Sequence, residues 1–212
     1  MIEIAPHPYL DAVCFVTRSA TAAGALDCSA ELVAALDPAG QQPLVLDAVR
    51  MNVRALLRHG GYKPSGRGKP ASEYLVGVFA EGRFPRINAL VDVCNVVSLH
   101  SGLPISLLDL DLLQGSWADG LSIRVMPHAT SYIFNASGQT IDASGLLALC
   151  DREGPAGTPV KDAQRTKTHA GTVNTLTIIW GSNALPGRTA VAHAAYLRLL
   201  ESLVGVHVES LT

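Results

Sequence analysis

Apolar residues recur with the period of an α-helix through much of the first half of the chain. The clearest case is residues 46–61, where an apolar stripe is followed by Gly60, placed where a left-handed helix cap is expected. The stripe consists of Val49, Val53, Leu56 and Leu57. Further helices are predicted at residues 29–37, 70–82 and 87–102, each with a capping serine, an early proline or a terminating glycine.

β-Branched and aromatic residues dominate the second half, which predicts strands. The expected strands fall within residues 121–127, 131–151, 175–181 and 206–210, with Ser137-Gly138 as a turn. Residues 103–113 are expected to be irregular or extended, residues 11–16 to form an earlier strand, and residues 188–205 to form an amphipathic helix. This order of elements predicts an α+β fold. Because no stretch has linker composition, one domain over residues 1–212 is expected.

Composition narrows the classes of protein further. The chain is 48% hydrophobic and 16% charged, which is enough to form a sizeable core. A net charge of −2 argues against a surface covered in cations for nucleic acid, and no DNA partner is expected. No signal peptide or apolar run of about 20 residues is visible, so we expect a soluble cytoplasmic protein without a membrane partner.

The four cysteines lie far apart and form no C-x-x-C pair. Each is surrounded by apolar or small residues, which predicts buried thiols in a reducing compartment and neither a disulfide framework nor a zinc site. The sequence also lacks a G-x-S-x-G elbow, an H-E-x-x-H motif and histidines at metal-ligand spacing. We therefore expect no metal, no cofactor and no protein nucleophile.

Cations are concentrated in one window. Half of the sixteen Lys and Arg lie between Arg50 and Arg86, against two acids, which gives a local formal charge of +6. Arg54 and Arg58 share a helix face with Arg50, and a glycine-rich loop with three more cations follows. Those cations are Lys63, Arg67 and Lys69. The window is either an ordinary charged helix face with a mobile loop or a phosphate-contacting surface; the spacing is not that of a nucleotide P-loop.

A second group of polar residues interrupts the apolar helix at residues 87–102. Asn88, Asp92 and Asn95 fall on one face of that helix. Such groups need partners when they are buried. They either bond the backbone and cap neighbouring loops, or they form the polar wall of a pocket.

The stretch "PVKDAQRTKTHAGTVN", residues 159–174, combines cations with hydroxyl groups. Its candidate ligand-binding residues are Lys161, Asp162, Arg165, Thr166, Lys167 and Thr168. Threonine hydroxyls beside Lys and Arg suit a carboxylate, a phosphate or a ribose edge. Lys161 and Asp162 would alternatively form an internal ion pair, which would make the segment structural.

Three segments together resemble a known family. They are "KPSGRGKPASEYL", "FPRINALVDVCNVVSLHSGLPISLLDLD" and "PVKDAQRTKTHAGTVN", and they are similar to the editing domain in the beta chain of phenylalanyl-tRNA synthetase, in particular to freestanding proteins built from that domain alone. The motif-bearing part runs from about Lys63 to Gly181. The order of Asn88, Asp92, Asn95, Pro104 and Asp109 carries the most specific part of the likeness.

The resemblance implies an α+β domain with a β-sandwich-like core and a pocket that hydrolyses wrongly attached tyrosine from tRNA. Hydrolysis in that family relies on positioned water and the terminal hydroxyl of the RNA. Two positions depart from the pattern: Ser106 stands where the synthetase domain has a histidine, and Ile178 stands where it has a glutamate. These departures put activity on tyrosyl-tRNA in doubt.

Three hypotheses follow from this resemblance. The first is a trans-acting hydrolase of mischarged tRNA, in which Arg54, Arg58, Lys63, Arg67 and Lys69 steer phosphates. In this hypothesis Asn88, Asp92 and Asn95 shape the pocket. The terminal nucleotide or the developing oxyanion is held by Lys161, Arg165, Thr166, Lys167 and Thr168. The second is a non-catalytic module that binds RNA or an amino acid. The third is a small-molecule hydrolase or sensor that reuses the fold.

Overall fold

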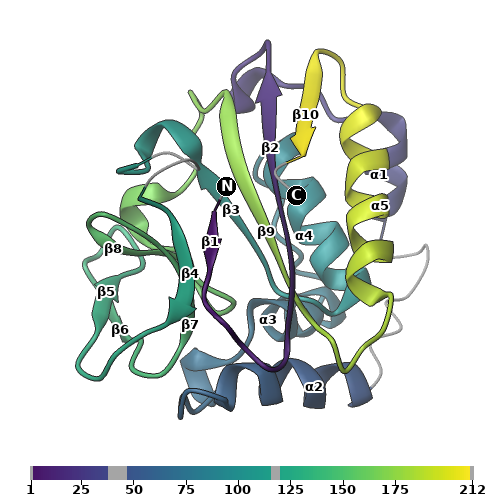
Figure 1. Cartoon of the computed structure of the whole chain (residues 1–212). Coiled ribbons are helices and arrows are strands. Elements are labelled where there is room, and N and C mark those ends of the chain that lie inside the picture. Colours follow the sequence, from purple (N-terminus) through teal and green to yellow (C-terminus); the bar gives the residue numbers. More distant parts are fainter. Residues whose placement is uncertain (1, 38–46, 116–119, 211–212) are drawn as a thin grey trace.

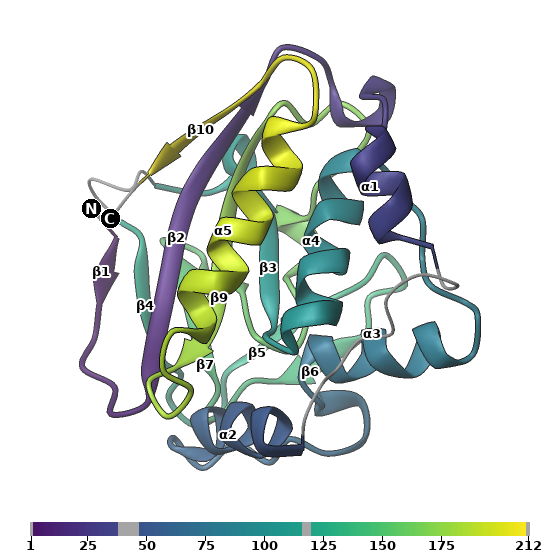
Figure 2. The ribbon, with the colours of Figure 1, turned by 90° about the vertical axis from the view of Figure 1, so that its right-hand side faces the viewer.

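Two four-stranded β-sheets form the centre of the molecule, and helices cover one face of the larger sheet (Figures 1 and 2). This computed structural model describes residues 2–37, 47–115 and 120–210. Within these residues the chain is a single α+β domain, with most helices in the first half and antiparallel strands in the second. The predicted fold class is confirmed.

One sheet has longer strands than the other, and we call it the larger sheet. Its strand order is β10-β2-β9-β3, and all its pairs are antiparallel. Its strands are β2 (Leu10–Ser19), β3 (Ile105–Asp109), β9 (Asn174–Ser182) and β10 (Val206–Ser210). Strand β9 lies between β2 and β3, and its residues from Thr175 to Ser182 are all buried. This central position explains why even the threonines of the strand, Thr175 and Thr177, are fully buried.

The smaller sheet has the order β1-β4-β7-β8, and a two-stranded hairpin, β5–β6, lies beside it. Its strands are β1 (Glu3–Ile4), β4 (Ser122–Val125), β7 (Leu147–Asp151) and β8 (Gly154–Gly157), and the hairpin strands are β5 (Ser131–Ile133) and β6 (Thr140–Asp142). Strand β1 pairs with β4 in parallel, while the other pairs are antiparallel. The two four-stranded sheets meet where β3 contacts β8.

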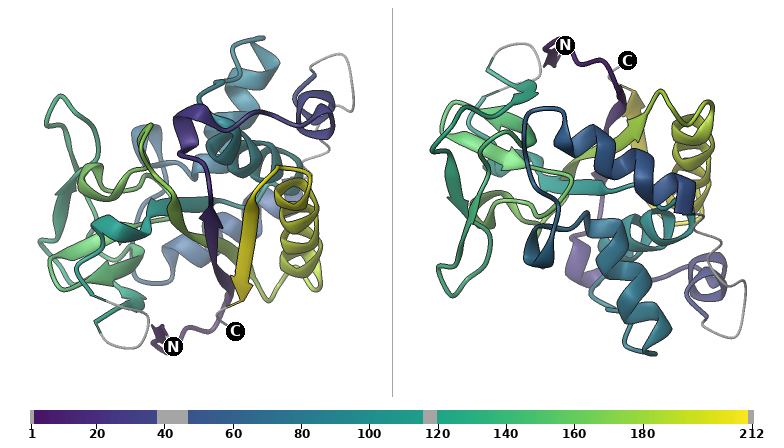
Figure 3. Two further views of the ribbon diagram at one scale, coloured as in Figure 1. Left: turned by 90° about the horizontal axis from the view of Figure 1, so that it is seen from above. Right: turned by 90° about the horizontal axis from the view of Figure 1, so that it is seen from below.

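Five α-helices are present in the described part of the chain. They are α1 (Ala30–Ala35), α2 (Asp47–Arg58), α3 (Ala71–Ala80), α4 (Ala89–Ser101) and α5 (Arg188–Glu201). Helices α4 and α5 lie side by side over the larger sheet (Figure 2), and α2 crosses its lower end (Figures 1 and 3). None of the described helices combines the length and apolar character needed to cross a bilayer.

The core lies mainly between α4, α5 and the larger sheet. Trp180, Tyr196 and Phe15 are among its largest fully buried side chains. The rings of Phe15 and Tyr196 meet edge to face at 5.1 Å, so α5 is fixed against β2 by an aromatic pair as well as by aliphatic contacts.

Most predicted elements are confirmed, including the buried stripe of α2 and the Ser29 cap of α1, whose side chain accepts from the Leu32 N–H. The predicted end of that helix near residues 38–40 lies outside the described residues. Residues 103–113 contain the regular strand β3, followed by a short 3-10 turn at Leu110–Leu112. Of the four cysteines, which are all free, three are buried, but Cys28 is only half-buried.

The prediction that Gly60 caps α2 in a left-handed conformation is wrong. Gly61 has the positive φ, +91°, while Gly60 is required for a different reason. A side chain at Gly60 would overlap the backbone of Gly145, and a side chain at Gly145 would overlap the Gly60 carbonyl group. This close approach fixes the end of α2, and the basic loop that follows it, against the smaller sheet.

We predict that Gly145→Ala lowers the free energy of unfolding far more than Gly138→Ala. Both glycines have φ near +75° (72° and 76°), so both substitutions carry a strain of about 1–2 kcal/mol. Only the alanine at 145 also collides with backbone, which adds about 1–3 kcal/mol. Urea unfolding of both variants checks this, and equal losses would contradict the proposed role of the contact.

Candidate functional site

Two cationic segments that are far apart in the sequence line one pocket of about 710 Å³. The basic loop contributes Arg67 and Lys69, and the later segment contributes Lys161 and Lys167. Helix α3 forms one wall, and the β5–β6 hairpin adds Phe134, Asn135 and Gln139. Cations from both segments therefore lie around one pocket, although Lys63 of the basic loop does not line it.

The cations in this pocket are close enough to influence one another. Burial, together with the positive charges of Arg67 and Lys167, lowers the pKa of Lys161. The Lys161 ammonium group lies 4.0 Å from the centre of the Phe134 ring, and the Lys167 ammonium group donates to the Phe134 carbonyl oxygen at 2.6 Å. Phe134 thus holds both lysines near the pocket without neutralising either.

The acids that line the pocket are already paired. Glu73 accepts from the Arg54 guanidinium group through two contacts of 2.6 Å, and Glu81 forms an ion pair with Arg83. The pocket lining therefore holds five cations against two acids, and each of these acids has an arginine partner. The excess positive charge makes the pocket attractive to an anion.

Local contacts fix the basic loop. The Tyr62 hydroxyl donates to the Gly68 carbonyl at 3.1 Å, and a side chain at Gly68 would overlap that hydroxyl. The Ala71 N–H, at the start of α3, donates to the Pro159 carbonyl at 2.9 Å. This last bond joins the loop directly to the second cationic segment.

The second segment is held by its own polar contacts. The Tyr132 hydroxyl donates to the Lys161 carbonyl at 2.6 Å, and the Thr166 hydroxyl donates to the Ala156 carbonyl at 2.8 Å. Arg165 pairs with Asp151 through two contacts of 2.7 Å. Arg165 and Thr166 therefore order the segment and do not face the pocket, whereas Lys161 and Lys167 do.

Asn88, Asp92 and Asn95 are not among the residues that line the cationic pocket. The Asn88 side chain caps α4 by accepting from the Val91 N–H, and the buried Asp92 carboxylate accepts from the Ile87 N–H and from Arg86. Both contacts fasten the chain that enters α4. The half-buried Asn95 lies further along the same helix.

Arg54, Arg58, Lys63 and Thr168 also lie outside the pocket lining. Arg54 forms an ion pair with Glu73, while Arg58 and Lys63 are exposed on either side of the turn after α2. Thr168 is half-buried, one residue beyond Lys167. Proximity in sequence to a pocket lysine therefore does not place a side chain in the pocket.

The two positions that depart from the synthetase pattern lie opposite each other. Ser106 on β3 pairs in register with Ile178 on β9, and both are fully buried. The Ser106 hydroxyl accepts from the Trp180 indole N–H at 2.9 Å and donates to the Thr158 carbonyl at 3.2 Å. These side chains belong to the packed interior and contribute nothing to the cationic pocket.

The half-buried Asp162 lies next to these residues. Its carboxylate accepts from the Thr158 N–H at 3.2 Å and from the Leu107 N–H at 3.4 Å, and it forms no ion pair with Lys161. Burial raises the pKa of Asp162 to about 6, although these hydrogen bonds act in the opposite direction. Asp162 therefore links the second segment to β3.

Several pocket residues were not predicted from the sequence. Tyr74 on α3 is 65% exposed at the pocket, and Gly77 on the same helix opens it, since a side chain there would meet free space. Phe134, Asn135 and Gln139 come from a hairpin that was recognised only as a pair of strands. Arg83 also lines the pocket, and its place in the basic window was the one sequence signal that could have identified it as a pocket residue.

The pocket is suited to binding an anion beside a planar group. Lys and Arg supply charge-assisted donors, and an exposed tyrosine ring offers a surface on which a base can stack. Its described lining contains no Ser, Thr, Cys or His. Nor do three or more His, Cys, Asp or Glu gather as a possible metal site anywhere in the described ranges.

We predict that the stability difference between the wild-type protein and Asp162→Asn depends on pH. The pKa of Asp162 rises from 3.8 to about 6 on folding, so its contribution to stability is complete below pH 3.8 and is lost as pH rises through about 6. Between pH 4 and 7, wild type should lose up to about 3 kcal/mol relative to the variant.

Urea unfolding across this pH range measures that difference. The matched control is Asp142→Asn, because hydrogen bonds from Ser144 lower the pKa of the exposed Asp142. The difference between wild type and this control should stay nearly constant above pH 4.5. A constant difference for Asp162→Asn as well would show that the Asp162 pKa is not raised.

Comparison with models of protein families matches residues 68–188, more than half of the chain, to the B3/4 domain. This domain type is found in the editing region of the phenylalanyl-tRNA synthetase beta chain. No match was found among curated proteins. The matched range contains α3, α4 and the strands from β3 to β9. It also contains four of the five pocket cations, and the fifth, Arg67, lies one residue before it. The chain belongs to the B3/4 domain family.

Proposed function

We propose that this protein binds the aminoacylated 3′ end of a tRNA and hydrolyses the ester of a wrongly attached amino acid. The observation that carries the proposal is the convergence of Arg67, Lys69, Lys161 and Lys167 around one pocket. Membership of the B3/4 family gives this pocket its context, because the domain occurs in a synthetase editing region. We infer that the whole chain, residues 1–212, acts as one unit in the cytoplasm.

In this proposal the phosphates of the terminal nucleotides contact the cations of the pocket. Tyr74 presents its ring to the terminal base, because stacking on an exposed aromatic side chain is a common way to hold a single-stranded RNA end. Arg58 and Lys63, which are exposed next to the basic loop, attract the RNA backbone further from its end. Binding is then expected to weaken steeply as salt concentration rises.

The chemical step requires no side-chain nucleophile. A water molecule attacks the carbonyl carbon of the ester, the bond to the ribose oxygen breaks, and the products are a free amino acid and a tRNA with a free terminal hydroxyl. Lys161 or Lys167 stabilises the negative charge that develops on the carbonyl oxygen. The lowered pKa of Lys161 also suits proton transfer to the departing ribose oxygen.

A second candidate function is a module that binds the RNA end without hydrolysing it. The observation in its favour is the burial of Ser106 and Ile178, which stand where the synthetase domain carries polar groups associated with editing. A serine bonded to an indole and an apolar isoleucine offer no replacement for those groups. In this second candidate function the cationic pocket binds RNA, but the protein does not hydrolyse the ester.

The test is release of amino acid from a panel of mischarged tRNAs at micromolar protein. Wild type is expected to cleave at least one ester faster than buffer does, and a Lys161→Met, Lys167→Met double variant should be about 100-fold slower or more. Gly77→Phe should also block the reaction, because a large side chain at this position fills the pocket.

Two controls separate these effects from damage to the fold. Gly77→Ala should keep activity and stabilise α3 by about 0.5–1 kcal/mol, and Arg198→Met, a change on α5 outside the pocket, should leave activity unchanged. Salt-dependent tRNA binding without ester cleavage would select the non-catalytic module. If the protein neither binds nor cleaves any tRNA, both candidates are overturned.

A further inference from the structure

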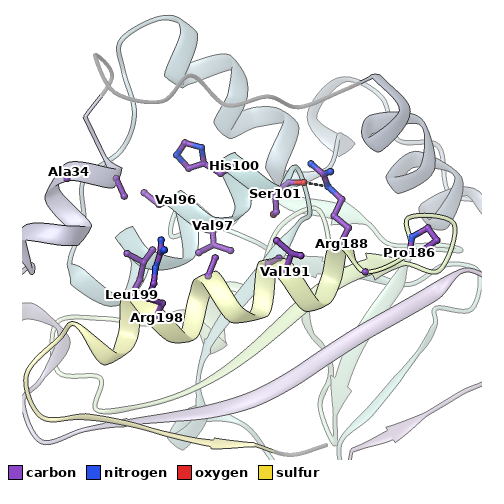
Figure 4. Close-up of a pocket in the computed structure, with 14 residues that line it drawn as sticks. Ala34, Val96, Val97, His100, Ser101, Pro186, Arg188, Val191, Arg198 and Leu199 are labelled. Atoms are coloured by element: carbon purple, nitrogen blue, oxygen red, sulfur yellow. Dashed lines mark hydrogen bonds between the residues drawn. The ribbon is translucent and has the colours of Figure 1, made fainter.

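A second pocket, of about 760 Å³, lies between helices α1, α4 and α5 (Figure 4). Its walls are mostly aliphatic and include Val96 and Val97 from α4 and Val191, Ala195 and Leu199 from α5. We call it the helical groove. None of the residues that line it also lines the cationic pocket. It is therefore a separate site, independent of the function proposed above.

The groove leaves apolar surface exposed. Val191 is 71% exposed although it points along the groove from the first turn of α5 (Figure 4). A pocket of this volume with mainly aliphatic walls and few polar groups has the size and composition of small-molecule sites. A polar group at the edge of such a site determines which ligand it selects.

Arg188 supplies that polar group at one end of the groove. Its Nε donates to the Ser101 carbonyl at 2.6 Å, which fixes the guanidinium group at the C-terminus of α4 (Figure 4). Among the described residues no carboxylate forms an ion pair with it. By contrast, Arg198 at the other side of the groove pairs with Glu31 at 2.9 Å. Burial lowers the pKa of Arg188, which agrees with a charge held partly away from water and without an acid.

The distribution of charge restricts the ligand to a small class. One anchored guanidinium group presents paired N–H donors, a geometry that matches a carboxylate. Nucleic acid needs several cations in a row, and the groove has only one without an acidic partner among its described lining residues. An amine is excluded by the sign of the charge.

We propose that the helical groove binds an amphiphilic monocarboxylate, with the carboxylate on Arg188 and the aliphatic chain along Val97, Val191 and Leu199. Burial of the chain against α4 and α5 supplies most of the affinity, and the guanidinium group fixes the orientation. The two pockets have no lining residue in common, so the ligand would bind whether or not the cationic pocket is occupied.

Octanoate is the probe, with octylamine and octanol as matched compounds that carry the same chain. Titration calorimetry on the full chain should detect octanoate binding at submillimolar to millimolar concentration, with octanol clearly weaker and octylamine not bound. Loss of the charge in Arg188→Met should weaken octanoate binding by roughly 10- to 100-fold.

A second variant keeps the proposal testable if Arg188→Met disturbs the end of α4. Ala195→Phe places a ring in the groove and leaves Arg188 intact, so it should abolish binding of octanoate while the thermal unfolding temperature stays close to that of wild type. Arg198→Met, which removes the paired arginine, should leave the affinity within about threefold, because rim ion pairs contribute little. No octanoate binding to wild type, or equal binding to wild type and Ala195→Phe, would overturn the proposal.

Discussion

The hydrogen bond from the Ala71 N–H to the Pro159 carbonyl joins the two parts of the chain on which the proposed site depends. It ties the start of α3, and with it the basic loop, to the segment that carries Lys161 and Lys167. Holding these cations together is unfavourable in the absence of an anion, because Arg67 and Lys167 both disfavour the charge on Lys161. The fold maintains this arrangement through contacts elsewhere, and an anionic ligand would relieve the repulsion.

Three arginines in this region have a structural task, whereas Arg67 lines the pocket together with the lysines. Arg54, Arg86 and Arg165 each form close ion pairs with a carboxylate and hold neighbouring segments together. Lys161 and Lys167 make no such pair and reach the pocket from an ordered backbone. The planar guanidinium groups of Arg54 and Arg165 each bond their carboxylate through two contacts, while an ammonium group on a flexible stem remains available to a ligand.

The sequence predicted the elements of the fold well because most of them depend on local signals. The apolar stripe of α2, the Ser29 cap and the turn at Gly138 are all encoded by residues close together in the chain. Gly60 was misread because its constraint is the backbone of Gly145, which is distant in sequence. The same limit applies to the site: the charge clusters were visible, but Tyr74 and Phe134 join it only through tertiary packing. Arg165 and Asp92 were candidates whose ion-pair partners, Asp151 and Arg86, no spacing rule reveals.

The central claim is that Lys161 lies in a cluster of like charges that accepts the anionic end of an RNA. Its most direct test is an NMR titration of the lysine side chains, with Lys161 assigned through Lys161→Arg, in the free protein and with the trinucleotide CCA. The account predicts a Lys161 pKa below the usual lysine value in the free protein, a rise when Arg67 is replaced by alanine, and a rise when CCA binds. An ordinary Lys161 pKa that neither Arg67→Ala nor CCA changes would contradict it.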